Sequence, residues 1–119
     1  MALTKSTATT IMSAVPISAS ATAASSSYDV SDAIYASLEI FMDYSTNPTS
    51  GNVSIYVYAS DDGTNWSDDA FSAFTITPDT DRRTVFGIEV VPYKYIKVDV
   101  TNGTDQSFDC TINASKVTL

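Results

Sequence analysis

Histidine is absent from this sequence of 119 residues, and cysteine occurs only once, as Cys110. Without histidine the chain cannot form a Ser-His-Asp or Cys-His catalytic system, and it lacks the commonest zinc ligand. A single cysteine also excludes an intrachain disulfide, so packing must hold the fold together. Cys110 lies in a segment in which apolar residues recur at every second position. We therefore expect a buried structural thiol, because no histidine is present to activate it as a nucleophile.

Basic residues are also scarce. Six lysines and arginines stand against fourteen aspartates and glutamates, which gives a net charge of -8. A surface with this charge repels phosphate backbones and anionic lipid headgroups. We therefore expect neither nucleic acid nor a membrane as a partner. The same charge keeps free subunits apart until a complementary surface binds them.

Long apolar runs are missing as well. No segment approaches the roughly 20 apolar residues of a membrane helix. The amino terminus resembles a secretion signal only in part, because serine and threonine interrupt the apolar residues around Ile11–Ile17. We expect neither a cleaved signal nor a membrane helix.

Carboxylates are abundant and form three close pairs, Asp61/Asp62, Asp68/Asp69 and Asp79/Asp81. Such pairs could supply the two acids of a glycosidase or the oxygen ligands of a calcium ion. The segment Asp61–Asn65, however, lacks the alternating acidic spacing and the distal glutamate of an EF-hand loop. All three pairs fall in predicted turns, where aspartate is favoured because it bonds the local backbone. We expect solvated turns and no enzyme activity, metal or cofactor; calcium binding and catalysis are the alternatives.

From Tyr28 onward the apolar pattern has a period of two, which is typical of half-buried strands. No window shows a helical period, and turn residues such as Asn47-Pro48 and Asn102-Gly103 separate the segments. A chain of this length fits one domain. The sequence therefore predicts an all-β fold, a two-sheet antiparallel, jelly-roll-like sandwich of about seven or eight strands. The expected strands run through residues 38–42, 53–59, 70–77, 83–91, 93–101 and 107–117.

The first 27 residues are rich in serine, threonine and alanine. One extended segment, Thr10–Ser18, contains Pro16, which favours an edge strand or an arm over a central strand. Residues 19–27 form a small-residue connector. We expect residues 1–27 to be an extended amino-terminal arm or edge strand with its connector, and residues 28–119 to be the sandwich. A frayed terminus with one edge strand is the alternative.

The segment Ser60–Trp66 follows an alternating strand and ends in the only tryptophan. Asp62 and Gly63 supply the backbone freedom for a tight hairpin reversal. Trp66 can then fold back against the core as a large apolar anchor. We expect Gly63, Trp66 and Cys110 to be structural anchors.

Aromatic residues in the outward phase of predicted strands are a second feature. Tyr56 and Tyr58 lie two residues apart on one strand, and Phe41 has a similar position on another. Such rings could stack on sugars or anchor a protein interface, and a different phase would place them in the core. We favour the core or a subunit interface over a sugar platform. With the apolar residues of the arm, the expected interface with a partner or a second subunit is Ile11, Val15, Ile17, Phe41, Tyr56 and Tyr58.

Two segments carry a family resemblance. Ser60–Trp66 reads Ser-Asp-Asp-Gly-Thr-Asn-Trp, and Tyr93–Asn102 reads Tyr-Lys-Tyr-Ile-Lys-Val-Asp-Val-Thr-Asn. The turn and the strand resemble those of small β-sandwich proteins of tailed bacteriophage virions, and they also occur in discoidin-like and galactose-binding-like sandwiches. The resemblance covers about residues 28–119. The terminal cysteine pair common in secreted discoidin domains is missing, which favours the virion family.

The resemblance implies a virion structural protein, with a head decoration or cement protein as the first choice. Its partners would be the major capsid protein and further copies of itself, and a trimer would suit the local threefold positions of a capsid. It would lie on the capsid surface, and in the host cytoplasm during assembly. Copies would dock over junctions between capsid subunits, with the arm extended across a neighbour, and symmetry would add up many weak contacts. The alternatives are a carbohydrate-binding module or tail adhesin, and then a tail or neck component.

Overall fold

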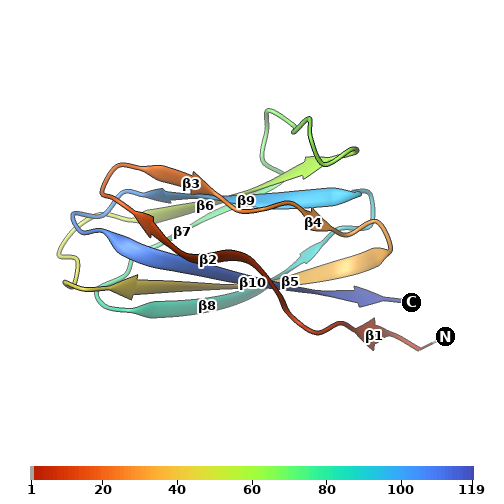
Figure 1. The fold of residues 1–119 in the computed structure, drawn as a ribbon, viewed down its shortest axis with the longest axis horizontal. Coiled ribbons are helices and arrows are strands. Elements are labelled where there is room, and N and C mark those ends of the chain that lie inside the picture. The colour runs from red at the N-terminus through yellow and green to blue at the C-terminus, as the bar shows by residue number, and fades with distance from the viewer. Residues whose placement is uncertain (1) are drawn as a thin grey trace.

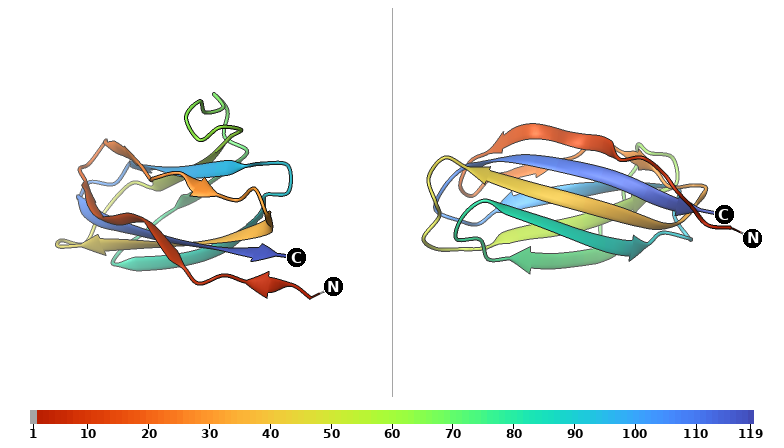
Figure 2. Two further views of the ribbon diagram at one scale, coloured as in Figure 1. Left: turned by 45° about the vertical axis from the view of Figure 1, so that its right-hand side comes forward. Right: turned by 90° about the horizontal axis from the view of Figure 1, so that it is seen from below.

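A computed structural model describes residues 2–119 as two antiparallel five-stranded sheets packed face to face (Figure 1). In sheet A, β10 lies between β5 and the strands β1 and β2, and β8 is the outer neighbour of β5 (Figure 2, right). In sheet B, β9 lies between β6 and the strands β3 and β4, and β7 is the outer neighbour of β6. The bounds are β1 Thr4–Lys5, β2 Thr9–Ile17, β3 Thr22–Ala24, β4 Tyr28–Asp29, β5 Ala33–Tyr44, β6 Val53–Ser60, β7 Ser72–Ile76, β8 Arg82–Glu89, β9 Tyr95–Asn102 and β10 Phe108–Thr118.

The core fills the space between the sheets, and the alternation of apolar residues places it there. In β5, Leu38, Ile40 and Met42 are buried, whereas the residues between them point outward. The central strands β6, β9 and β10 repeat this pattern, since side chains on successive strand residues point to opposite faces. The prediction of an all-β, two-sheet antiparallel sandwich is confirmed.

The structure has ten strands rather than seven or eight because three short strands form near the amino terminus. The strand β1 pairs with the end of β10, and β3 and β4 both pair with β9. Residues 22–24 were expected to be a connector. They become a strand because the edge of β9 offers partners for their backbone groups, which would otherwise depend on water.

The segment expected as an extended arm or edge strand lies on its own domain as β2, an edge strand of sheet A paired with β10. The pairing is irregular between Thr10 and Val15, and Ala14 has a φ of 46°. Through this irregularity both Ile11 and Met12 point into the core, where regular alternation would have turned one of them outward. Packing of these side chains therefore ties β2 to the sandwich.

A buried polar group fastens the end of β2 to the turn between β9 and β10. The Nδ2 atom of Asn102 donates to the carbonyl oxygens of Ile17 at 3.0 Å and Gln106 at 2.8 Å. Its Oδ1 accepts from the backbone N–H and the hydroxyl of Thr104, at 3.0 and 2.6 Å. All hydrogen-bonding groups of the amide are therefore satisfied, which makes its burial compatible with a stable fold.

The beginning and the end of the chain lie at the same end of the sandwich (Figure 1), because Thr4 pairs with Thr118. In the described residues, no helix is long and apolar enough to cross a membrane.

Candidate functional site

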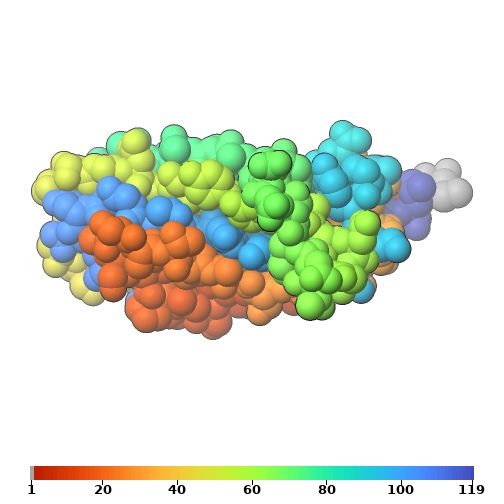
Figure 3. Space-filling view, turned by 90° about the horizontal axis from the view of Figure 1, so that it is seen from above, coloured from red at the N-terminus to blue at the C-terminus, as the bar shows by residue number. Residues whose placement is uncertain are grey.

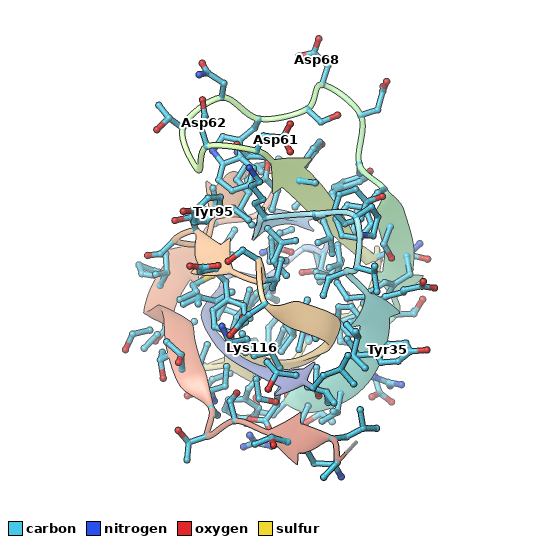
Figure 4. The ribbon with its side chains drawn as sticks, turned by 90° about the vertical axis from the view of Figure 1, so that its right-hand side faces the viewer. Tyr35, Asp61, Asp62, Asp68, Tyr95 and Lys116 are labelled. Atoms are coloured by element: carbon cyan, nitrogen blue, oxygen red, sulfur yellow. The ribbon has the colours of Figure 1, made fainter. Side chains whose placement is uncertain are left out.

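Four exposed apolar side chains belong to segments at the end of the sandwich where the chain begins and ends. We call this surface, made of Leu3, Tyr35, Val91 and Leu119, the apolar pole; each of the four residues is between 51% and 66% exposed. Leu3 and Leu119 adjoin the paired ends of β1 and β10, Tyr35 lies near the start of β5, and Val91 follows β8. Figure 4 faces this end and shows Tyr35 pointing away from the domain. Exposed apolar side chains at one end of a domain are candidates for an interaction surface.

Lys116, which Figure 4 labels, makes two polar contacts at the same end of the sandwich as the apolar pole. Its Nζ atom donates to Asp32 Oδ1 at 2.7 Å and to the carbonyl oxygen of Asp29 at 3.1 Å. The hydrogen bond between the side chains holds the pKa of Asp32 below its usual range and raises the pKa of Lys116. The pole therefore lies next to a fixed ion pair, which could orient a bound partner.

The loop formed by residues 61–71 connects β6 to β7 and stands on the outer face of sheet B, where Figure 3 shows it in green. Ser60 starts it: its Oγ accepts from the backbone N–H of Gly63 at 2.9 Å and donates to the carbonyl oxygen of Asn65 at 2.6 Å. The carboxylate of Asp62 accepts from the backbone N–H groups of Asn65 and Thr64, both at 2.8 Å. These bonds, those from Asn65 first, hold the pKa of Asp62 well below its usual range.

Gly63 occupies a position that only glycine fits easily. Its φ is 77°, and an added Cβ would lie 3.5 Å from the ring of Tyr95. The distance is an ordinary van der Waals contact, so the backbone angle rather than the space favours glycine here. The reversal is longer than the tight hairpin turn that the sequence predicted, because the hydrogen bonds of Asp62 organise a separate turn before β7 begins.

The expectation that Trp66 packs in the core is wrong: its side chain is half-buried and lies outside the core cluster. The loop folds over the outer face of sheet B, so Trp66 meets residues of that face. Lys97 Nζ lies 5.4 Å from the centroid of a Trp66 ring and 5.6 Å from that of Tyr58. This geometry is within the range of cation–π attraction.

The outer face of sheet B therefore carries an aromatic–lysine cluster, made of Tyr58, Trp66 and Lys97. The register of β6 and β9 creates it, because Tyr58 lies opposite Lys97 and Tyr56 lies opposite Asp99. Lys97 Nζ also forms an ion pair with Asp99 Oδ1 at 3.7 Å. Asp99 Oδ1 is buried and has no hydrogen-bond partner among the described residues.

A hollow of about 470 Å³ opens beside this cluster under the loop. Aromatic rings and carboxylates line it together, a combination that can stack on and hydrogen-bond to a polar ring such as a sugar. Its lining residues are Ala59, Ser60, Asp61, Asp62, Asn65, Trp66, Ser67 and Tyr93. Figure 4 shows Asp61, Asp62 and Asp68 in this loop and Tyr95 beneath Asp62.

The described residues hold no cluster of three or more groups suited to a metal ion. Cys110 lies in the core, and burial raises the pKa of its thiol to about 12. The thiolate, which is the reactive form of cysteine, is therefore scarce at neutral pH.

The structure does not bring the six expected interface residues together. Ile11 and Ile17 are buried in the core of their own domain and Val15 is half-buried, so the two isoleucines cannot contact a partner in this fold. Phe41 lies on the outer face of sheet A, with the guanidinium carbon of Arg83 at 4.5 Å from its ring centroid. The remaining two, Tyr56 and Tyr58, lie on the outer face of sheet B.

Sequence reasoning missed Lys97 and the apolar pole. The alternation of β9 does place Lys97 outward, but only the register with β6 shows that it faces Tyr58. The pole combines the two ends of the chain with residues near positions 35 and 91, and no local pattern connects such distant segments.

No family model matches the sequence, and no curated protein is similar enough to count as a match. Solved structures share the fold. The SPBc2 prophage-derived protein YomS superposes with a TM-score of 0.58 at 13% identity, over 99% of this chain and 96% of that chain. The PBSX exported protein XepA gives a TM-score of 0.62 at 13% identity, over 92% of this chain but only 36% of XepA.

A virus particle contains the same fold. A chain of the naturally occurring empty particles of cowpea mosaic virus superposes with a TM-score of 0.56 at 9% identity, over 92% of this chain and 85% of that chain. At these identities the likenesses establish a common sandwich architecture, which unrelated functions can share.

Proposed function

We propose that this protein is a structural component of a tailed-bacteriophage virion and that it decorates the head as a cement protein bound to the major capsid protein. The observation that supports this most is the extent of the shared fold. The sandwich matches a prophage-derived protein over nearly the whole length of both chains, and it also matches a chain of an empty virus particle.

The apolar pole supplies the docking surface in this proposal. Tyr35 lies in β5 and Val91 in the turn after β8, so ordering these two side chains on binding costs little conformational entropy. The net charge of -8 keeps free copies soluble until the capsid binds them. Each contact is small, and repetition over a symmetric shell makes the total stabilisation large.

Binding to heads that lack the protein tests this function. Purified protein is added to heads assembled from the major capsid protein of the encoding phage, and occupancy is measured by cosedimentation and electron cryomicroscopy. We expect ordered occupancy with the pole against the shell, and at least a tenfold weaker binding for the double variant Tyr35→Asp/Val91→Asp. Tyr56→Asp, which changes an exposed aromatic residue away from the pole, is the matched control.

No occupancy of the heads by the full-length protein would overturn the proposal. Occupancy that is equally reduced by Tyr56→Asp and by the double variant would remove the pole from it.

The aromatic–lysine cluster and its hollow favour a second candidate function, binding of a carbohydrate, as in a binding module or tail adhesin. Stacking on an aromatic ring, with sugar hydroxyls donating hydrogen bonds to the Asp61 carboxylate or bonding the Asn65 amide, would hold a sugar. A glycan array with the intact protein tests it. Binding that Trp66→Ala or Tyr58→Ala abolishes and Phe41→Ala preserves would support this candidate, and a blank array would reject it.

A further inference from the structure

The strand β8 is a long edge strand that contains no proline and no irregular pairing. It pairs only with β5, in unbroken register from Arg82 to Glu89, and within residues 2–119 no strand pairs with its other side. The other edges are blunted: β2 contains Pro16 and an irregular pairing, and β3, β4 and β7 are two to five residues long. Proteins normally avoid long, regular, free edges, because they pair with other strands.

The direction of the free backbone groups in β8 follows from one hydrogen bond. The N–H of Val90 donates to the carbonyl oxygen of Ile34 at 3.0 Å, so residue 90 directs its backbone groups toward β5. In an antiparallel pair, alternate residues direct both groups to the same side. The residues whose backbone N–H and C=O groups face the free edge are therefore Arg83, Val85, Gly87 and Glu89.

We propose that β8 pairs in antiparallel fashion with β8 of a second copy of this chain, about a twofold axis through Phe86. A twofold axis perpendicular to the sheet keeps the outer faces of the two copies on the same side of the joined sheet. Residues that face each other across the axis must then both point outward or both point inward, so their positions in the sequence differ by an even number. With the axis at Phe86, Arg83 faces Glu89 of the second copy and Val85 faces Gly87 of the second copy. This register uses every free backbone group at the edge.

Charge complementarity selects both the partner and the register. Arg83 is at one end of β8 and Glu89 at the other, so the antiparallel pair contains two Arg–Glu contacts on its outer face. Arg83 is 54% exposed in its side chain, and its contacts with Glu39 and Phe41 leave further guanidinium donors free. A register with the axis at Val85 would instead place Arg83 opposite Gly87, and both contacts would be lost.

The same register covers an exposed apolar residue. Val85 is 60% exposed, and Gly87 opposite it leaves room for its side chain. Two copies with a net charge of -8 each also repel one another at long range, so we expect a reversible dimer that forms best when salt screens this repulsion. The inference does not depend on the virion function proposed above.

Charge reversal at the two ends of β8 tests the pairing. In Arg83→Glu the facing groups are both acidic, and in Glu89→Arg both are basic, so each variant alone should dimerise about tenfold more weakly than the natural protein. In an equimolar mixture the two variants face each other with opposite charges, and dimers should return as mixed pairs. The measurement is sedimentation equilibrium at about 0.15 M salt, with tagged variants to identify the mixed pair.

Two matched controls change the charge equally at exposed positions off the edge. Lys94→Glu corresponds to Arg83→Glu, and Asp43→Arg corresponds to Glu89→Arg; both should dimerise like the natural protein. Circular dichroism and melting temperature confirm that each variant folds. If Arg83→Glu does not fold, the pairing is still tested by Glu89→Arg alone. Among the described residues Glu89 takes part in no ion pair within the chain, so its replacement removes no such contact from the fold.

Amide hydrogen exchange gives an independent measurement on the unaltered chain. On raising the concentration, the amides of Val85 and Gly87 should become protected, whereas those of Thr84 and Phe86, already bonded to β5, should not change. A natural protein that stays monomeric up to about 1 mM would overturn the proposal. A dimer that survives Glu89→Arg unchanged, or that leaves Val85 and Gly87 exchanging freely, would also overturn it.

Discussion

At the residue scale, the loop on sheet B depends on one carboxylate. Asp62 accepts bonds from Asn65 and Thr64 while its side chain stays in solvent, and these bonds define the first turn of the loop. Such local bonds explain why aspartate is common in turns. They also make the shape of the loop sensitive to protonation of this one group.

Protonation of Asp62 should therefore account for part of the stability that the fold loses in acid. Its pKa is lowered in the folded state, mainly by the bond from the Asn65 backbone, whereas it is about 3.9 in an unfolded chain. The carboxylate thus stabilises the fold above about pH 4, and this contribution is lost as the pH falls toward the folded pKa. Asp62→Asn should show a smaller drop in melting temperature between about pH 5 and pH 3 than the natural protein.

The matched control for this prediction is Asp68→Asn. Asp68 belongs to the same loop, and its side chain accepts no hydrogen bond from the described residues. Its variant should keep the pH dependence of the natural protein. Equal drops in Asp62→Asn and the natural protein would contradict the prediction.

Trp66 gives a second prediction at this scale. Because the ring is half-buried on the outer face of sheet B, Trp66→Ala should lower the free energy of unfolding by about 1 kcal/mol, measured by urea titration. A ring packed in the core would cost about 3 to 5 kcal/mol. The native emission of this only tryptophan should lie between the values typical of buried and of fully exposed rings. A loss above about 3 kcal/mol would contradict the position of Trp66.

At the element scale, β2 connects the two sheets. It places Ile11, Met12 and Ile17 in the core and leads directly into β3 on the other sheet. Removing it would expose one edge of β10, including the backbone of Cys110, which pairs with Val15. The reactivity of the single cysteine therefore shows whether β2 covers this edge of β10.

We predict that the intact protein reacts very slowly with a thiol reagent at neutral pH, because Cys110 is fully buried and its thiol has a pKa of about 12. Deleting residues 1–18 should increase the reaction rate by at least about a hundredfold and lower the melting temperature. Deleting residues 1–3, which leaves β1 and β2 in place, is the control. A truncated protein with an unreactive cysteine and an unchanged melting temperature would show that residues 1–18 are dispensable.

The sequence predicted the central strands better than the edges. Buried residues alternate through residues 38–42 of β5, 53–57 of β6 and 96–102 of β9, and the expected strands overlap the observed ones, although β5 begins five residues earlier, at Ala33. The strand β2 breaks the alternation at Ile11 and Met12, and β3 contains only small residues, so their pairing depends on edges that the tertiary fold creates. Trp66 was misplaced for a similar reason, because its position depends on how the loop folds over sheet B.

At the scale of the whole molecule, charge dominates the surface. The net charge is -8, and the described residues contain three ion pairs. Like charges on one compact body repel, and salt screens that repulsion within about a nanometre. The acidic surface thus favours association with a less acidic partner, a property that composition alone predicted.

We predict that the melting temperature rises when sodium chloride increases from about 0.01 M to about 0.3 M. A variant in which three exposed aspartates are neutralised, Asp43→Asn, Asp68→Asn and Asp79→Asn, should show a smaller rise. A melting temperature that falls with salt would mean that the local ion pairs outweigh the general repulsion.

The meeting of the two chain ends at the apolar pole has a practical consequence for labelling. A fluorescent protein or affinity tag fused at either end would adjoin Leu3 and Leu119, which flank the paired ends of β1 and β10, and would shield them. A fusion of this kind would report a failure of docking that the tag itself had caused. A short peptide inserted in the loop of residues 61–71, on the outer face of sheet B, would mark the protein and leave that end of the sandwich bare.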